Sequence, residues 1–195
     1  MATLPNFKLL WLGYPRGISD DVKARIGGQV NYGWIKNTCT IRMSRAFNYA
    51  GHLIPSDHEG LSTTRGGDGL RYAFRVAEFR PYLLETFGAP TLTKRGAAGE
   101  ISAEDFAGRK GVICFEVSGF ETATGHFDMW DGHRTVSGAY FGMSEAVHLW
   151  EAPEGDLSLS IEAGVGVGQP NRDADVKVVQ TLLNLCEETY HYIPV

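Results

Sequence analysis

The hydrophobic pattern of the chain changes at Gly111, and this change constrains the fold more than any other feature. Before Gly111, apolar side chains recur at helical spacing, most clearly in residues 39–50 and 70–87. After Gly111, short runs rich in β-branched and aromatic residues are bounded by turn residues, which is typical of strands. The strands predicted in this way cover residues 112–117, 125–130, 135–141, 146–150 and 157–161. Helices followed by a meandering antiparallel sheet indicate an α+β fold.

Loops separate the helices that are predicted in the first half. A short helix is expected within residues 20–30. Residues 52–69 are rich in Ser, Thr, Gly and Asp and are predicted to form a long loop, and residues 93–99 form a second one. The helix over residues 70–87 is expected to break or restart at Pro81, because proline removes a helical hydrogen bond.

Cys39 lies at the start of the predicted helix over residues 39–50. Asn37 or Thr38 can cap its free backbone N–H groups. Because these groups and the helix dipole favour an anion, a helix start stabilises a thiolate, which is the nucleophile of cysteine hydrolases. The alternative is that Cys39 is a small buried apolar side chain, since it shares one helix face with Met43, Ala46 and Phe47.

A cysteine nucleophile needs a base within hydrogen-bond reach. Among the six histidines, His126 is the one in a predicted strand whose neighbour across a tight turn can also be predicted. Asp131 and Gly132 form a typical two-residue hairpin turn, which would place Trp130 opposite His133. The alternative for His126 is a half-buried strand histidine that bonds only to the backbone.

The same register predicts which side chains orient the His126 ring. Counting outward from the turn places His126 opposite Ser137. Asp128 lies on the same strand face as His126, because side chains alternate along a strand. Either Ser137 or Asp128 can therefore accept a hydrogen bond from the imidazole and fix its tautomer.

Composition narrows the class of protein. With 195 residues the chain is long enough for one well-buried core. Its formal charge of −5 argues against a nucleic-acid partner. No apolar run approaches the ~20 residues that span a bilayer, so no membrane insertion is expected. Residues 7–12 are interpreted as a core segment and not as a signal peptide.

The cysteine count argues against a disulfide framework. The chain has three cysteines, Cys39, Cys114 and Cys186, which fits synthesis in a reducing cytoplasm. A bridge between Cys114 and Cys186 stays open. No metal or cofactor is expected, because the spacing of His52, Asp57 and His58 matches no zinc pattern. The glycine run over residues 164–168 lacks the lysine of a phosphate-binding loop.

Two motifs carry a family resemblance. Residues 37–44 (NTCTIRMS) and 125–132 (GHFDMWDG) resemble the paired motifs of the type VI secretion amidase effectors of family four. Tyr140-Phe141 and residues 144–150 also resemble that family, so that the likeness spans residues 5–152. It implies a papain-like fold of the NlpC/P60 type, with N-terminal helices packed on an antiparallel sheet. The domain is assigned to residues 1–158.

The resemblance implies an activity, a location and partners. Members of the family cut peptidoglycan stem peptides between D-glutamate and meso-diaminopimelate. The type VI secretion apparatus delivers them into the periplasm of rival Gram-negative bacteria, which fits a chain made in the cytoplasm without a signal peptide. A cognate periplasmic immunity protein protects the producer.

The resemblance also assigns site residues. Cys39 would be the nucleophile, His126 the general base, and the Cys39 backbone N–H part of an oxyanion hole. The family's third residue is an aspartate on the strand after the histidine, and the aligned residue here is Ser137. A serine stabilises an imidazolium less than a carboxylate does, so Asp128 is the alternative orienting residue. Arg65, Lys94 and Arg95 are weaker candidates for contacts with substrate carboxylates.

Residues 159–195 form a C-terminal extension. Residues 165–184 resemble the opening of a peptidoglycan-binding repeat, but the segment is too short to bury a core of its own. This extension and Ser137 motivate the competing hypothesis of a non-catalytic cell-wall binding protein with a degenerate site. A related cysteine acyltransferase or protease is the other alternative.

Overall fold

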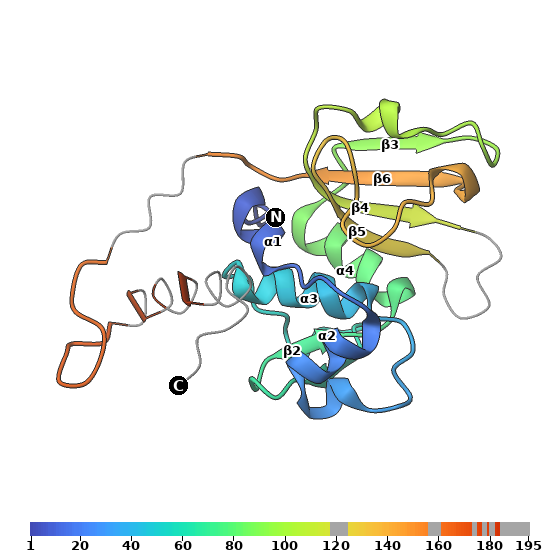
Figure 1. The fold of residues 1–195 in the computed structure, drawn as a ribbon. Helices are drawn as coiled ribbons and strands as arrows, with labels where there is room; N and C mark the ends of the chain where they lie inside the picture. Colours follow the sequence, from blue (N-terminus) through green and yellow to red (C-terminus); the bar gives the residue numbers. More distant parts are fainter. Residues whose placement is uncertain (118–124, 156–160, 173–174, 177–178, 180–181, 184–195) are drawn as a thin grey trace.

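The computed structural model describes residues 1–117, 125–155, 161–172, 175–176, 179 and 182–183 (Figure 1). Helices come first and the main sheet follows, so the predicted α+β class is confirmed. The helices are α1 (Phe7–Gly13), α2 (Ser19–Ile26), α3 (Cys39–Tyr49) and α4 (Val76–Phe87), with short 3₁₀ helices η1 (Gly28–Asn31), η2 (Ala103–Phe106) and η3 (Phe141–Met143). The strands are β1 (Thr63–Arg65), β2 (Arg71–Ala73), β3 (Leu92–Arg95), β4 (Gly111–Glu116), β5 (His126–Trp130) and β6 (Ala146–Glu151).

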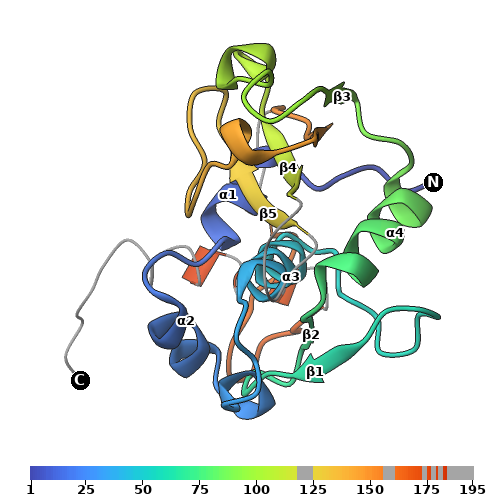
Figure 2. The same cartoon turned by 90° about the vertical axis from the view of Figure 1, so that its right-hand side faces the viewer.

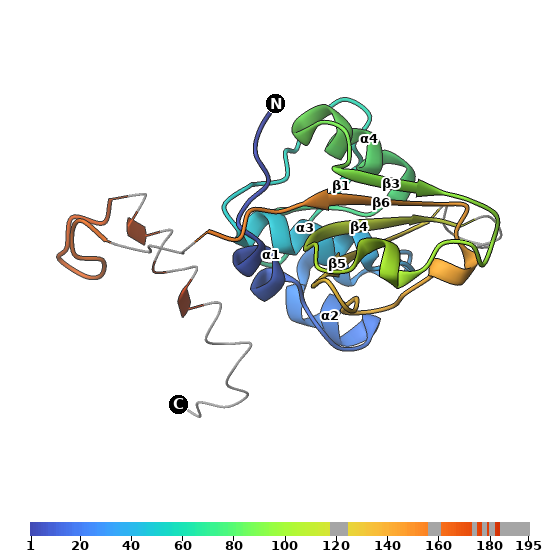
Figure 3. The ribbon, with the colours of Figure 1, turned by 90° about the horizontal axis from the view of Figure 1, so that it is seen from above.

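The main sheet has the strand order β3-β6-β4-β5, and every neighbouring pair is antiparallel (Figure 3). Strand β4 lies between β6 and β5, and its alternate side chains face two separate cores. Val112 and Cys114 join a core with side chains of α1, α3 and α4. Ile113 and Phe115 face a second core that η2 and η3 cover. Strand β5 is left at the edge of the sheet, beside α3.

Helix α3 is the centre of the helical part. Figure 2 shows it nearly end-on, between the main sheet and the small β1–β2 hairpin. All its residues from Cys39 to Asn48 are buried, including two arginines. The Arg42 guanidinium donates to the carbonyls of Pro15 and Gly17, and Arg45 donates to that of Gly13. These bonds tie the connection between α1 and α2 to the start of α3.

The helix predicted over residues 70–87 begins later than expected, at Val76. Residues 71–73 instead form β2, which pairs with β1 inside the predicted loop 52–69. The Asp68 carboxylate explains the difference, because it accepts the Leu70 N–H and the Tyr72 hydroxyl and holds a turn that a helix would disrupt. Pro81 does not interrupt α4, which is continuous to Phe87.

Two predictions for the main sheet are wrong. Residues 92–95, placed partly in a loop, form strand β3 on β6. Residues 135–141 do not continue the sheet as a strand: Trp130 bridges to Thr135 and not to His133, because the turn is longer than two residues. The Asp131 side chain accepts the backbone N–H groups at positions 133 and 134 and closes this longer turn.

Several expectations fall wholly or partly outside the described residues. These are the strand at 157–161, the domain boundary at 158, most of the extension 159–195, and Cys186. Cys114 is a free, buried cysteine. None of the helices in the described parts of the chain combines the length and the apolar character that crossing a bilayer would require.

Candidate active site

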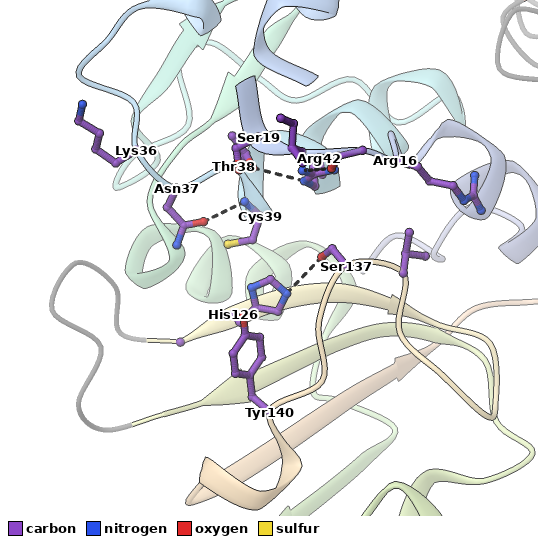
Figure 4. A pocket seen from close by; sticks show the side chains of 14 residues that line it. Arg16, Ser19, Lys36, Asn37, Thr38, Cys39, Arg42, His126, Ser137 and Tyr140 are labelled. Carbon is purple, nitrogen blue, oxygen red and sulfur yellow. Dashed lines mark hydrogen bonds between the residues drawn. The ribbon is translucent and has the colours of Figure 1, made fainter. Parts of the chain in front are cut away.

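An open cavity of about 640 Å³ lies between the start of α3, the connection from α1 to α2, and the start of β5 (Figure 4). Cys39 and His126 both line it, and so does Ser137. The paired motifs, almost ninety residues apart in the chain, therefore meet at one cavity. Its other lining residues are Arg16–Ser19, Lys36–Thr38, Arg42, Gly125, Val136 and Tyr140.

Cys39 is the first residue of α3 and is 3% exposed. Of the two caps considered, Asn37 makes the contact: its Oδ1 accepts the Cys39 backbone N–H at 2.9 Å. Thr38 makes no capping bond, because its hydroxyl lies 3.0 Å from the Ser19 hydroxyl and accepts a bond from Arg42 Nε. The backbone N–H expected in an oxyanion hole is thus already engaged by a side chain.

His126 is the first residue of β5, and its ring packs against Tyr140 with the ring centres 4.8 Å apart. Its Nε2 lies 3.4 Å from Asp128 Oδ2 and 3.5 Å from Ser137 Oγ. Figure 4 shows the Cys39 sulfur pointing toward the ring on the side away from Ser137. The imidazole therefore has one side toward the thiol and the other toward Asp128 and Ser137.

Asp128 is fully buried, and backbone donors surround it. Oδ2 accepts the N–H groups of Ser137 and Gly138 at 2.8 and 2.9 Å, together with the Ser137 hydroxyl at 2.8 Å. Oδ1 accepts those of Met129 and Val136. These bonds bend residues 136–138 around the carboxylate, where a strand would have continued. The predicted proximity of His126 and Ser137 is thus produced by Asp128, and not by strand pairing.

Tyr14 completes this network from the far side, and sequence reasoning missed it. Its side chain is fully buried, and its hydroxyl lies 3.2 Å from Ser137 Oγ. Since Ser137 donates its proton to the Asp128 carboxylate, Tyr14 is the donor in the contact with Ser137. Tyr14 follows α1, more than a hundred residues before Ser137, and nothing in its local sequence signals the contact.

The charges of the site are coupled. Burial alone lowers the pKa of His126, but the hydrogen bond with Asp128 and the interactions with Cys39 outweigh it and raise that pKa to about 9. Burial alone raises the pKa of Asp128, but the bond with His126 and the N–H groups of Gly138 and Ser137 lower it below its usual value. At neutral pH the site therefore holds an imidazolium beside a buried carboxylate.

The comparisons with known proteins agree with this geometry. Residues 35–150 match the model of a family described as type VI secretion system (T6SS) amidase effector protein 4, Tae4. The chain belongs to this family. The match contains Cys39, His126, Asp128 and Ser137, whereas Tyr14 lies outside it. No curated protein matches the chain.

Solved Tae4 structures share the fold. The effector from Salmonella typhimurium, in complex with the immunity protein Tai4 from Enterobacter cloacae, is 29% identical with a TM-score of 0.71, over 76% of this chain and 99% of that one. A selenomethionine variant of the S. typhimurium Tae4/Tai4 pair is 30% identical, with a TM-score of 0.69 and the same coverage. Tae4 from E. cloacae is 29% identical with a TM-score of 0.69, over 78% of this chain and 99% of that one.

Other predicted contacts lie away from the cavity. Arg65, Lys94 and Arg95 do not line it, and Lys94 pairs with Asp105 at 3.1 Å. His52 and His58 form no metal cluster with Asp57, and no such cluster occurs elsewhere in the part of the chain that the structure describes. Three arginine and lysine side chains do line the cavity. Arg16 and Lys36 are exposed, and Arg42 is buried.

Proposed function

We propose that this Tae4-family protein is a peptidoglycan amidase that cuts the D-glutamate–meso-diaminopimelate bond of stem peptides through Cys39 and His126. The observation that carries the proposal is the convergence of the thiol, the imidazole and the Asp128 carboxylate at one open cavity. Nucleophile, base and orienting group in this order are the arrangement that thiol-dependent acyl transfer requires.

The mechanism is acyl transfer in two steps. The Cys39 thiolate attacks the scissile carbonyl carbon, and an Sγ–C bond forms. The His126 imidazolium donates its proton to the leaving amine as the C–N bond breaks, which leaves a thioester on Cys39. The neutral imidazole then takes a proton from water, the hydroxide attacks the thioester, and the carboxylate product and the thiol are released.

Asp128 acts through His126 and is a positioning residue. Its buried negative charge stabilises the imidazolium, and its contact with Nε2 directs the other ring nitrogen toward Cys39. We assign this role to Asp128 in preference to Ser137, because the serine is neutral and donates its own proton to the same carboxylate. Ser137, with Tyr14 behind it, helps to hold that carboxylate in place.

The family also suggests where the protein acts and what inhibits it. We propose delivery by the type VI apparatus into the periplasm of a target cell, where peptidoglycan is accessible. Two of the similar solved structures are effector–immunity complexes, which supports a cognate immunity protein of the Tai4 kind as the partner. The alternatives, a binding protein with a degenerate site or another thiol acyltransferase, are outcomes of the experiment below.

Digestion of purified Gram-negative sacculi tests the activity. The wild-type protein is expected to release stem-peptide fragments with a new diaminopimelate amine, and Cys39→Ala is expected to release none. Cys114→Ala is the matched control, since Cys114 is also buried and free but lies away from the cavity. Cleavage that survives Cys39→Ala, or binding to sacculi without cleavage by the wild-type protein, would contradict the proposal.

A further inference from the structure

The Asn37 carboxamide has a fixed orientation beside the nucleophile. A backbone N–H can only donate, so the 2.9 Å contact with Cys39 N identifies the accepting atom as Asn37 Oδ1. The amide nitrogen, Nδ2, must then point away from that backbone nitrogen, as Figure 4 shows. Asn37 lines the cavity, so both of its Nδ2 protons are available beside the site of attack.

This contact changes the supply of donors for an oxyanion. Attack on a carbonyl leaves a negative oxygen, which hydrolases stabilise with preorganised N–H groups. The Cys39 N–H is the expected donor, but it is bonded to Asn37. Thr38 and Arg42 are engaged with each other, and the Arg42 guanidinium also donates to two carbonyls. By contrast, Asn37 Nδ2 has no acceptor within the described residues.

We propose that Asn37 is a catalytic residue whose Nδ2 donates a hydrogen bond to the oxyanion of the tetrahedral intermediate on Cys39. The inference deepens the proposed function and rests on it. Asn37 transfers no proton: it stabilises the negative oxygen while the Sγ–C bond is present and the C–N bond breaks. The Asn37 carboxamide accepts the backbone N–H of Cys39 through Oδ1. Its Nδ2 then replaces that N–H as the hydrogen-bond donor in the cavity.

A purely structural role makes the opposite prediction, which can be tested. An asparagine that only caps α3 is replaceable by aspartate, which is an equally good cap, but not by alanine. Asn6 provides a control away from the cavity, because its Oδ1 likewise accepts the backbone N–H two residues later, that of Lys8 at 2.9 Å, at the start of α1. Unlike Asn37, Asn6 is the N-cap residue itself, and its Nδ2 donates to the Gly155 carbonyl.

The decisive measurement is kcat for cleavage of a purified disaccharide-tetrapeptide by the full chain. We expect Asn37→Asp to lower kcat on the order of 10²- to 10³-fold with little change in KM, as loss of an oxyanion donor does. Asn37→Ala should lose less than Asn37→Asp, because it frees the Cys39 N–H to act as donor. Asn6→Asp should keep the wild-type kcat. The rank order is therefore wild type, then Asn37→Ala, then Asn37→Asp.

The pH profile of kcat and thermal melting separate the donor role from effects of charge or of folding. The added negative charge of Asn37→Asp could act on ionisation alone, but it would then shift the pH profile of kcat and leave its plateau unchanged. A lowered plateau supports the donor role. A plateau for Asn37→Asp equal to or above that of Asn37→Ala overturns it, and thermal melting shows whether each variant is folded. Failure of the wild-type protein to cleave would instead refute the proposed function.

Discussion

At the scale of single residues, Asp128 has two roles, one electrostatic and one structural. It supplies the negative charge beside His126, and it holds residues 136–138 through their backbone N–H groups. We therefore expect a serine at position 137, where the resemblance implies an aspartate, to be compatible with catalysis, because Asp128 already places a carboxylate beside His126. The network also explains why Asp128 can be fully buried without destabilising the fold: both oxygens are saturated with donors.

Replacing Asp128 with asparagine should affect both activity and stability. The amide nitrogen cannot accept bonds from the surrounding N–H groups, and the imidazolium loses its counter-charge. We expect kcat to fall on the order of 10²- to 10⁴-fold, as when the aspartate of a serine-protease triad is replaced. The control is Asp131→Asn, whose Oδ1 can still accept its two turn N–H groups, and which should keep full activity. Equal activity of both variants would remove Asp128 from the mechanism.

The raised pKa of His126 predicts the alkaline limit of activity. The leaving amine needs the imidazolium proton, and the pKa of His126 is raised to about 9 because Asp128 and Cys39 favour the charged ring more than burial disfavours it. We expect kcat/KM for stem-peptide cleavage to fall above about pH 9. The Ser137→Ala variant keeps the Asp128 carboxylate, so its kcat/KM should fall at nearly the same pH as that of the wild-type protein. If kcat/KM of the wild-type protein fell near the ordinary histidine pKa instead, this assignment would be contradicted.

At the scale of elements, local patterns identified the parts whose side chains repeat regularly. Helix α3 and strands β4, β5 and β6 follow their hydrophobic periodicity, and the site rests on two of them. Two errors arose where one polar side chain sets the backbone: Asp68 turned a predicted helix start into β2, and Asp128 prevented the strand predicted at 135–141. Tyr14 could not be predicted, because its role depends on a contact with a distant segment.

Ser44 shows how α3 is fixed to its neighbours. Its hydroxyl donates to the Thr40 carbonyl and accepts the backbone N–H of Ala73 from β2 at 2.9 Å, and both groups are buried. Ser44→Ala leaves that N–H without an acceptor, so we expect it to lower the free energy of unfolding by about 1–3 kcal/mol. Ser144→Ala is the matched control, because Ser144 is equally buried and its hydroxyl donates to the carbonyl of Tyr140, four residues earlier. Within the described residues, the Ser144 hydroxyl accepts no backbone N–H. Urea unfolding compares the two variants, and equal losses would contradict the role of the Ala73 contact.

At the scale of the whole molecule, the partly buried His126 and the buried His148 have opposite charge states. His126 is held protonated on the edge strand, whereas His148 is held neutral on β6. Burial first, and then the positive charges of Arg80 and Arg95, lower the pKa of His148 to about 4. Its ring nitrogens lie 2.9 Å from Thr93 Oγ1 and 2.7 Å from Glu116 Oε1, which hold the neutral ring between β3 and β4. Each histidine makes the stability of the fold depend on pH in its own direction.

The two pH dependences should give the folded protein a stability maximum near the ordinary histidine pKa of about 6.5. Between about 6.5 and 9, the unfolded chain has released the His126 proton and the folded chain has kept it, so the free energy of unfolding falls as pH rises, by on the order of 3 kcal/mol. Between about 6.5 and 4, the unfolded chain binds a proton at His148 that the folded chain excludes, so the free energy of unfolding falls as pH decreases. Urea unfolding across this range should show both losses. His126→Gln should reduce the loss of stability at alkaline pH and leave the loss at acid pH unchanged, and His148→Gln should do the reverse. A free energy of unfolding of the wild-type protein that stays constant from pH 6.5 to 9 would refute the protonated state assigned to His126.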